Sequence, residues 1–162
     1  MFHTLNPGVY TAVLHSATNR NGIGLVELYD IWQSAPANAV NISTRGLVQT
    51  GNNVMIGGFI VGGSKSRMVM ARAIGPSLQT ANVSNPLADP KLELHNGSGT
   101  IVARNDNWRT TQEQQIRKTD LAPQNDKESA ILTTLAPGPY TAVVSGANGG
   151  TGVALVEVYQ LQ

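Results

Sequence analysis

The sequence contains no cysteine, which excludes disulfide bonds, thiol catalysis and thiolate metal sites. Charge is also scarce: Asp, Glu, Lys and Arg make up 13% of the 162 residues, about half the usual share, and the net charge is +1. The 11 Lys and Arg are scattered along the chain, so we expect no nucleic-acid partner. No apolar run reaches the length of a membrane span, so we expect no membrane insertion.

The start of the sequence, Met1-Phe-His-Thr4, does not read as a signal peptide. If the natural protein is exported, we therefore expect its targeting signal to lie outside these residues.

The residues that are abundant instead are Gly, Asn, Ser and Thr, with Pro at turn-like positions. This composition is typical of short strands joined by many turns. One short polar helix is predicted near residues 110–118. About nine or more short strands at regular spacing predict an all-β antiparallel sandwich or barrel. The predicted strands are Tyr10–Leu14, Ile23–Ile31, Val40–Thr44, Gly46–Gln49, Val54–Val61, Arg67–Ile74, Lys91–His95, Thr100–Arg104 and Ser129–Leu135, followed by two more in residues 138–161.

An internal repeat organises the chain. Residues 4–31 align with residues 134–161 at an offset of 130 without a gap, and 14 of the 28 pairs are identical. Both copies read as a β-hairpin with a loop rich in small residues. A match at a fixed period predicts one repeat unit plus the tail of another. We therefore expect a terminal hairpin at 1–31, a linker at 32–38 and a complete β-sandwich unit at 39–162.

The hairpin at 1–31 has no body of its own, and exposed β-edges recruit partners. We expect it to pack on a sandwich, either of its own chain or of another copy or neighbouring repeat unit, which would allow a fibre or a tandem array. The alternative is a tandem array divided at an arbitrary point. The residues expected at this assembly contact are Tyr10, Val13, Val26, Leu28 and Tyr29. Of these, Val26 and Leu28 share one strand face, and Tyr29 lies on the other with Leu25 and Glu27.

Two stretches resemble known families. The stretch Asp89-Pro-Lys-Leu-Glu-Leu-His-Asn-Gly-Ser-Gly-Thr-Ile-Val-Ala-Arg-Asn-Asp106, with Glu128-Ser-Ala-Ile131 and Leu135-Ala-Pro-Gly-Pro-Tyr-Thr-Ala-Val-Val144, resembles the bacterial pre-peptidase C-terminal domain. The segment Val40–Gly51 through Ala71–Leu78 resembles an uncharacterised tandem repeat of long secreted bacterial proteins. The first resemblance implies a jelly-roll sandwich of a secreted or cell-surface protein, in a family where some members bind calcium or matrix polymers.

A calcium site is the strongest metal hypothesis. Asp89, Asn105, Asp106 and Asn107 are the candidate ligands, with Glu93 or Glu128 as additions. Calcium takes six to eight oxygen ligands, which such residues supply. Asx side chains also cap turns by bonding their own backbone, and the full D-x-[DN]-x-[DN]-G loop is missing. No other cofactor is indicated.

Arg72 lies in a predicted apolar row with Met68, Met70 and Ile74. A buried guanidinium needs a carboxylate or carbonyls nearby, so we expect a structural ion pair with Glu157 or Glu128. The alternative role for Arg72 is ligand binding.

Two tryptophans stand beside polar loops. Trp32 and Trp108 could stack on sugar rings, which makes a polysaccharide a candidate ligand. The alternative for Trp108 is a plug at the edge of the sandwich.

The residues that catalysis would require do not form a local pattern. His3, His15 and His95 are dispersed, and Ser77 does not stand in a G-x-S-x-G elbow. No P-loop or dinucleotide fingerprint occurs. We therefore predict a non-catalytic structural or assembly module of a secreted or cell-surface repetitive protein. The alternative is an extracellular module that binds polysaccharide or matrix protein, with or without calcium.

Overall fold

A computed structural model describes residues 3–18, 20–31 and 39–161. The chain divides into two units, Met1–Ala39 and Val40–Gln162, and each is described by itself. The predicted linker at 32–38, with Trp32, lies outside the described residues.

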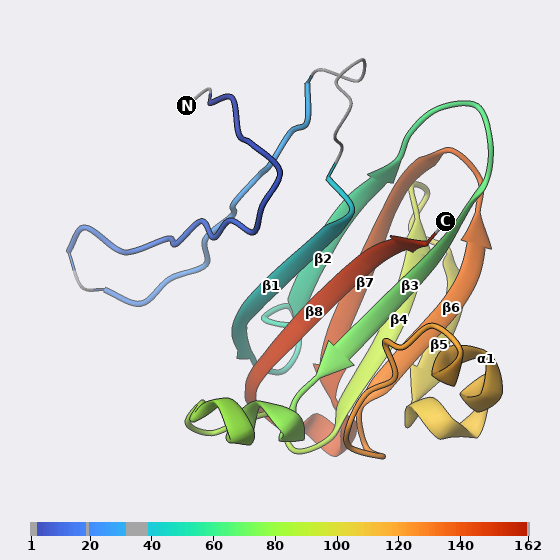
Figure 1. The fold of residues 1–162 in the computed structure, drawn as a ribbon. Helices are drawn as coiled ribbons and strands as arrows, with labels where there is room; N and C mark the ends of the chain where they lie inside the picture. Colours follow the sequence, from blue (N-terminus) through green and yellow to red (C-terminus); the bar gives the residue numbers. More distant parts are fainter. Residues whose placement is uncertain (1–2, 19, 32–38, 162) are drawn as a thin grey trace. The chain divides into compact units, whose positions relative to one another are not determined.

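The second unit contains eight strands and one short α-helix among its described residues (Figure 1). The strands β3 and β6 coincide with predicted segments and β4 extends one, and the two pieces expected at 40–49 form the single strand β1. The elements are β1 (Asn41–Val48), β2 (Met55–Val61), β3 (Arg67–Ile74), the 3-10 helix η1 (Pro76–Ala81), β4 (Pro90–Asn96), β5 (Ile101–Asp106), η2 (Trp108–Thr110), α1 (Glu113–Arg117), β6 (Ser129–Leu135), β7 (Gly138–Gly146), η3 (Ala147–Gly149) and β8 (Gly152–Leu161).

The strands form two four-stranded sheets with the orders β1-β8-β3-β6 and β2-β7-β4-β5. All six ladders are antiparallel. Eight antiparallel strands in two facing sheets with these orders make a jelly roll. The predicted all-β sandwich of jelly-roll type is therefore confirmed.

The main core fills the space between the two sheets. Alternate residues of β8 point into it, namely Ala154, Val156 and Val158, as the period of a strand requires. Gly57 of β2 faces Val156, and a Cβ at Gly57 would lie only 3.0 Å from the Val156 Cγ1 atom. The missing side chain at Gly57 thus leaves room for Val156 of β8.

A second, smaller apolar cluster covers the outer face of the β1-β8-β3-β6 sheet. It contains Met70, Trp108, Ile116 and Ala130, with Leu121, Tyr159 and others packed against it. Residues 108–122, including η2 and α1, form the cover. The helix is shorter than predicted, because only Glu113–Arg117 are α-helical.

The predicted closing hairpin is wrong. β7 pairs with β2 and β4, whereas β8 pairs with β1 and β3, so the two strands lie in opposite sheets. The turn between them, which includes η3, carries the chain from one sheet to the other. Alternation in the sequence locates two strands and a turn, but it does not identify the partner of either strand.

The strands predicted at Tyr10–Leu14 and Ile23–Ile31 are not formed in the described part of the first unit, residues 3–18 and 20–31. The physical reason follows from the second unit. The equivalent strands β7 and β8 do not bond to each other but to β1–β4, and the first unit has no counterpart of these four strands. The strand count among described residues is therefore eight rather than nine or more.

Candidate functional site

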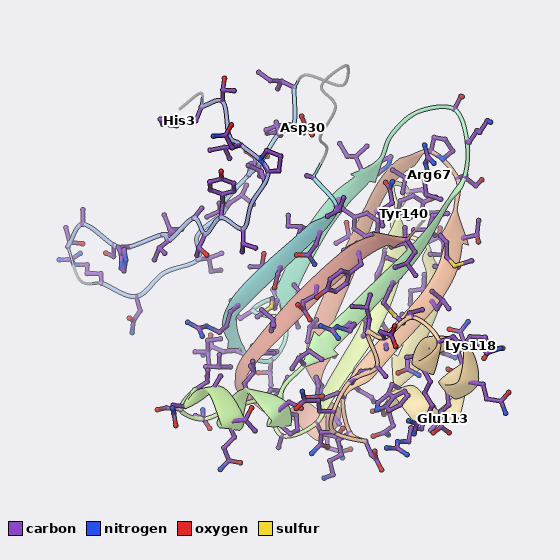
Figure 2. All side chains as sticks on the ribbon, viewed as in Figure 1. His3, Asp30, Arg67, Glu113, Lys118 and Tyr140 are labelled. Atoms are coloured by element: carbon purple, nitrogen blue, oxygen red, sulfur yellow. The ribbon has the colours of Figure 1, made fainter. Side chains whose placement is uncertain are left out.

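The first unit presents an unusual number of exposed apolar side chains. The five residues expected at an assembly contact have exposed fractions of 52–69%. Figure 2 shows the side chains of this unit projecting from the trace between His3 and Asp30. In the second unit, the equivalents of Val26 and Leu28 are Val156 and Val158, which are 2% and 7% exposed. The same apolar pattern is therefore core in one unit and surface in the other.

Two local tyrosine hydrogen bonds are the same in both copies. The Tyr10 hydroxyl donates to the Asn6 carbonyl at 2.8 Å, and the Tyr140 hydroxyl donates to the Ala136 carbonyl at 3.0 Å. A second tyrosine hydrogen bond occurs in both copies. The Tyr29 hydroxyl donates to Glu27 Oε1 at 3.0 Å, and the Tyr159 hydroxyl donates to Glu157 Oε1 at 2.7 Å. These short-range contacts form without the ladders.

Two substitutions between the copies compensate each other in size. Leu14 stands where the core has Val144, and Gly24 stands where it has Ala154. A Cβ built at Gly24 would overlap the Leu14 Cδ2 atom, so the larger residue occupies the place of the missing methyl group. Val plus Ala and Leu plus Gly have equal numbers of side-chain carbons. At these two positions the first copy thus retains the side-chain volume of the core segment, while Leu28 in place of Val158 adds one carbon.

An ion pair links the two central strands of the β1-β8-β3-β6 sheet. Arg72 of β3 donates from Nε to Glu157 Oε2 at 2.9 Å and from Nη1 to the Leu121 carbonyl at 2.6 Å. The Tyr159 hydroxyl donates to Glu157 Oε1, and the guanidinium lies 5.1 Å from the Tyr159 ring centre. Burial, together with the hydrogen bond to Glu157, raises the pKa of Tyr159. This arrangement uses the donors of Arg72 within the fold.

Glu128, the other predicted partner of Arg72, has a different role. Its fully buried carboxylate accepts hydrogen bonds from the Gly75 and Ser77 amides, at 3.2 and 2.9 Å, and from the Ser77 hydroxyl at 2.9 Å. The Asn125 amide adds a fourth at 3.2 Å. Glu128 therefore holds the start of η1 in place. No local sequence signal identifies this role, because the donors at Gly75 and Ser77 are about fifty residues away.

The candidate calcium ligands have different surroundings in the structure. Asn105 is buried: its Oδ1 accepts from the Ala130 amide at 3.0 Å, and its Nδ2 lies 3.3 Å from the Asn107 carbonyl and 3.3 Å from the Thr111 hydroxyl. Asp106 Oδ2 lies 3.6 Å from Lys91 Nζ. Asp89 Oδ1 is buried without a hydrogen-bond partner among the described residues.

The Asn105 side chain is thus bonded within the fold, and Asp106 pairs with Lys91. Across the ranges that the structure describes, no three His, Asp or Glu side chains are grouped as a metal site would require. The amide of Asn105 instead fastens β5 to β6. A calcium site that includes Asp89, Asp106 and Asn107 stays a prediction.

Trp108 is 1% exposed and packs in the smaller cluster with Met70 and Ile116. Its Nε1 donates to the Asn125 carbonyl at 3.1 Å, and the Arg109 and Arg117 guanidinium groups lie over its ring at 4.9 and 5.1 Å. The proposed sugar-stacking role of Trp108 is therefore wrong, because both the ring and its N–H are already used.

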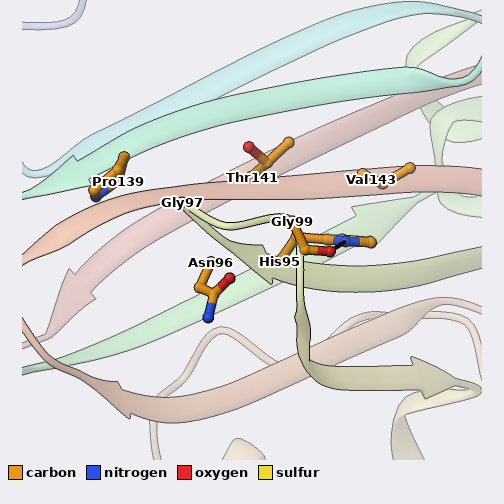
Figure 3. A pocket seen from close by; sticks show the side chains of 7 residues that line it. All are labelled: His95, Asn96, Gly97, Gly99, Pro139, Thr141 and Val143. Atoms are coloured by element: carbon orange, nitrogen blue, oxygen red, sulfur yellow. Dashed lines mark hydrogen bonds between the residues drawn. The ribbon is translucent and has the colours of Figure 1, made fainter.

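A shallow hollow lies on the outer face of the β2-β7-β4-β5 sheet (Figure 3). Its lining contributes one ionisable side chain, His95. The His95 Nε2 lies 3.2 Å from Glu93 Oε2, and Nδ1 lies 3.1 Å from the Gly99 carbonyl. Both ring nitrogens therefore have partners, and the hollow does not assemble a nucleophile with a base.

Among the described residues, no helix is long and apolar enough to span a membrane.

Comparisons with known proteins give one result of note. No family model matches the chain, and no curated protein matches it. Among solved structures, the pre-peptidase C-terminal domain of collagenase from Bacillus anthracis is similar, with 14% sequence identity and a TM-score of 0.47. The match covers 74% of this chain and 89% of that chain. That domain belongs to the family that residues 89–161 resemble; the fold class of this chain follows from its own strand order.

Proposed function

We propose that this chain is a non-catalytic structural module of a secreted or cell-surface repetitive protein, and that residues 4–31 join it to a sandwich of its own or a neighbouring subunit. The observation that carries the proposal is the exposed copy of two core strands. The resemblance of residues 89–161 to an extracellular domain family supports the location. The Asn105 side chain and the Trp108 ring are engaged inside the fold, so the proposal assigns them no ligand.

The exposed apolar surface supports an assembly role. Burying a Val, Leu or Ile side chain stabilises by roughly 1.5–3 kcal/mol relative to leaving it exposed. Leu14, Val26, Leu28 and Ile31 each have more than half of their surface exposed in this unit. Large exposed apolar groups on one segment mark an interaction site. A second sandwich would remove this surface from water.

The contact would be heterologous, because a segment of one copy meets a different surface of the next. Such contacts build open chains when the rotation does not close into a ring. The proposal therefore includes linear assembly, as a filament or as consecutive units of one polypeptide.

The proposal is tested by the mass of the full chain over a concentration series, using light scattering after size-exclusion chromatography. We expect the mass of the unaltered chain to rise with concentration, and the Val26→Asp/Leu28→Asp variant to remain monomeric. Val102→Asp is the matched control, because Val102 is also an exposed valine but lies on β5. It should associate as the unaltered chain does. A chain that stays monomeric at every concentration, and whose Val26→Asp/Leu28→Asp variant is as stable as the unaltered chain, contradicts the proposal, because residues 4–31 would then pack on neither sandwich.

A further inference from the structure

The positions of β7 and β8 are interior positions of the two sheets. β7 lies between β2 and β4, and β8 lies between β1 and β3. Each strand therefore satisfies its backbone groups on both sides. Docking at an exposed edge would satisfy one side only, and would leave the other row of N–H and C=O groups open. A segment with this sequence is matched to an interior place.

The side chains of the first copy also fit that interior place. Val26 is identical to Val156, which packs against Gly57. Glu27 and Tyr29 are identical to the pair that binds Arg72 of β3. The acceptor must therefore carry an arginine on the β3 strand and a glycine on the β2 strand. The sandwich of this same chain has both.

We propose that Gly8–Ser16 and Gly22–Ile31 occupy the β7 and β8 positions in the sandwich of a second copy of this chain. This inference rests on the proposed function for the fact of association. It adds the place where the segment binds, which is between strands rather than on an edge.

The acceptor copy must release its own β7 and β8 for this to occur. The entering strands replace the released ones with the same ladders, the same ion pair and a core volume that is larger by one side-chain carbon, because Leu28 stands where the core has Val158, as in domain swapping. The released residues 138–161 then have the same unsatisfied surface that residues 4–31 had. Each exchange thus releases residues 138–161 of the acceptor copy, and this segment can enter the next copy.

Rescue of a damaged core tests the proposal in the full chain. Val156→Asp places a charge in the core and disables the chain's own β8. We expect this variant to keep a cooperative thermal transition and to have the mass of an oligomer, because Val26 of a second copy fills the place. Val26→Asp should melt as the unaltered chain does. Val26→Asp/Val156→Asp should show no cooperative transition.

Three outcomes overturn the proposal. If Val156→Asp is as unfolded as the double variant, the first copy does not enter the sandwich. If Val156→Asp and Val26→Asp/Val156→Asp both fold, an aspartate at residue 156 is tolerated and residue 26 has no part in the rescue. If Val156→Asp folds as a monomer, the donor is the same chain and not a second copy.

A disulfide cross-link tests the register and needs no damaged core. Met68 of β3 is the register partner of Leu161, whose equivalent in the first copy is Ile31. β3 has β8 on one side and β6 on the other, so a strand added at an edge cannot reach it. A chain with Met68→Cys is mixed with a chain with Ile31→Cys, unfolded and refolded together, and then oxidised. The native sequence has no cysteine to compete.

We expect a covalent dimer of the two different chains. Asp30→Cys in place of Ile31→Cys is the off-register control and should give several-fold less dimer, since its expected partner is residue 69 and its side chain lies on the opposite face of the strand. Equal yields in the two mixtures, or no dimer, overturn the proposal. The proposed function can fail separately: association without this cross-link would leave the module role intact and remove the interior binding mode.

Discussion

Val26 and Val156 occupy the same place in two copies of one segment, yet Val26 is 52% exposed and Val156 is 2% exposed. The residues on either side match as well, from Leu25 and Leu155 to Glu27 and Glu157. What differs is the set of neighbours. In residues 134–161 the two strands lie between four others, and in residues 4–31 those four are missing from the unit.

This comparison separates what a strand sequence contains from what a strand requires. The hydrogen bonds from Tyr10 to Asn6 and from Tyr29 to Glu27 form in the exposed copy, because the partners are close in the chain. The ladders do not form, because their partners would have to come from β1–β4. A β-strand is a property of a pair, and two strands of opposite sheets cannot serve each other.

The largest loss of stability is expected when Arg72 is removed, because only the buried copy has this partner for its glutamate. Arg72→Ala would leave the buried Glu157 carboxylate without its guanidinium, and breaking such a pair destabilises by about 3–5 kcal/mol. Urea unfolding at dilute concentration measures this loss. Glu27→Gln is the matched change in the exposed copy and should alter stability by less than about 0.5 kcal/mol. Equal losses in the two variants would contradict the difference between the copies.

An intermediate effect is expected when the core is given the side chains of the exposed copy. Val144→Leu alone overpacks the core, at about 1–3 kcal/mol, and Ala154→Gly alone removes a buried methyl group. The two changes together restore the original volume. We therefore expect the double variant to be less destabilised than the sum by on the order of 1 kcal/mol. Strict additivity in a double-mutant cycle would show that the two positions do not share space.

The smallest effect concerns pH. The pKa of Tyr159 is raised above its ordinary value of 10.0, first by burial and then by the hydrogen bond to Glu157. A group with a raised folded-state pKa contributes stability that is complete below the unfolded pKa and is lost as pH rises through the folded pKa. Stability should therefore fall as pH rises above about 10, with a slope from this group below about 1.4 kcal/mol per pH unit.

Tyr159→Phe should make that alkaline slope shallower, as measured by urea unfolding at a series of pH values. Tyr29 is the counterpart, and its pKa is raised chiefly by the hydrogen bond to Glu27. Tyr29→Phe should leave the slope for the sandwich unchanged, because Tyr29 is not among its residues. A slope that changes equally in both variants would contradict this assignment.

Much of the sandwich could be predicted from local patterns. The bounds expected for Arg67–Ile74 and Ser129–Leu135 are those of β3 and β6. The expected row that includes Met70 and Arg72 is the outer face of β3, because alternation along a strand is a local property. The 3-10 helix at Pro76–Ala81 was not expected, since it depends on the distant carboxylate of Glu128.

The sequence predicts the roles of the candidate site residues less completely than the strands, because those roles depend on contacts between residues far apart in the chain. Of the two carboxylates considered for Arg72, strand register brings Glu157 to it and leaves Glu128 elsewhere. Asn105 and Trp108 carry chemistry suited to a metal and a sugar, but both are buried and bonded within the fold. Residue type indicates what a side chain can do, and burial decides whether a ligand can reach it.

The sequence by itself determined the β-strand content, the repeat at an offset of 130, and the equivalence of residues 4–31 to residues 134–161. These depend on composition and on neighbours along the chain. Only the tertiary structure decided that the repeated segment is two strands of opposite sheets rather than a hairpin. The reason is that alternation defines the two faces of a strand, whereas its hydrogen-bonding edges are alike in every sequence, so partners emerge only when the sheets pack.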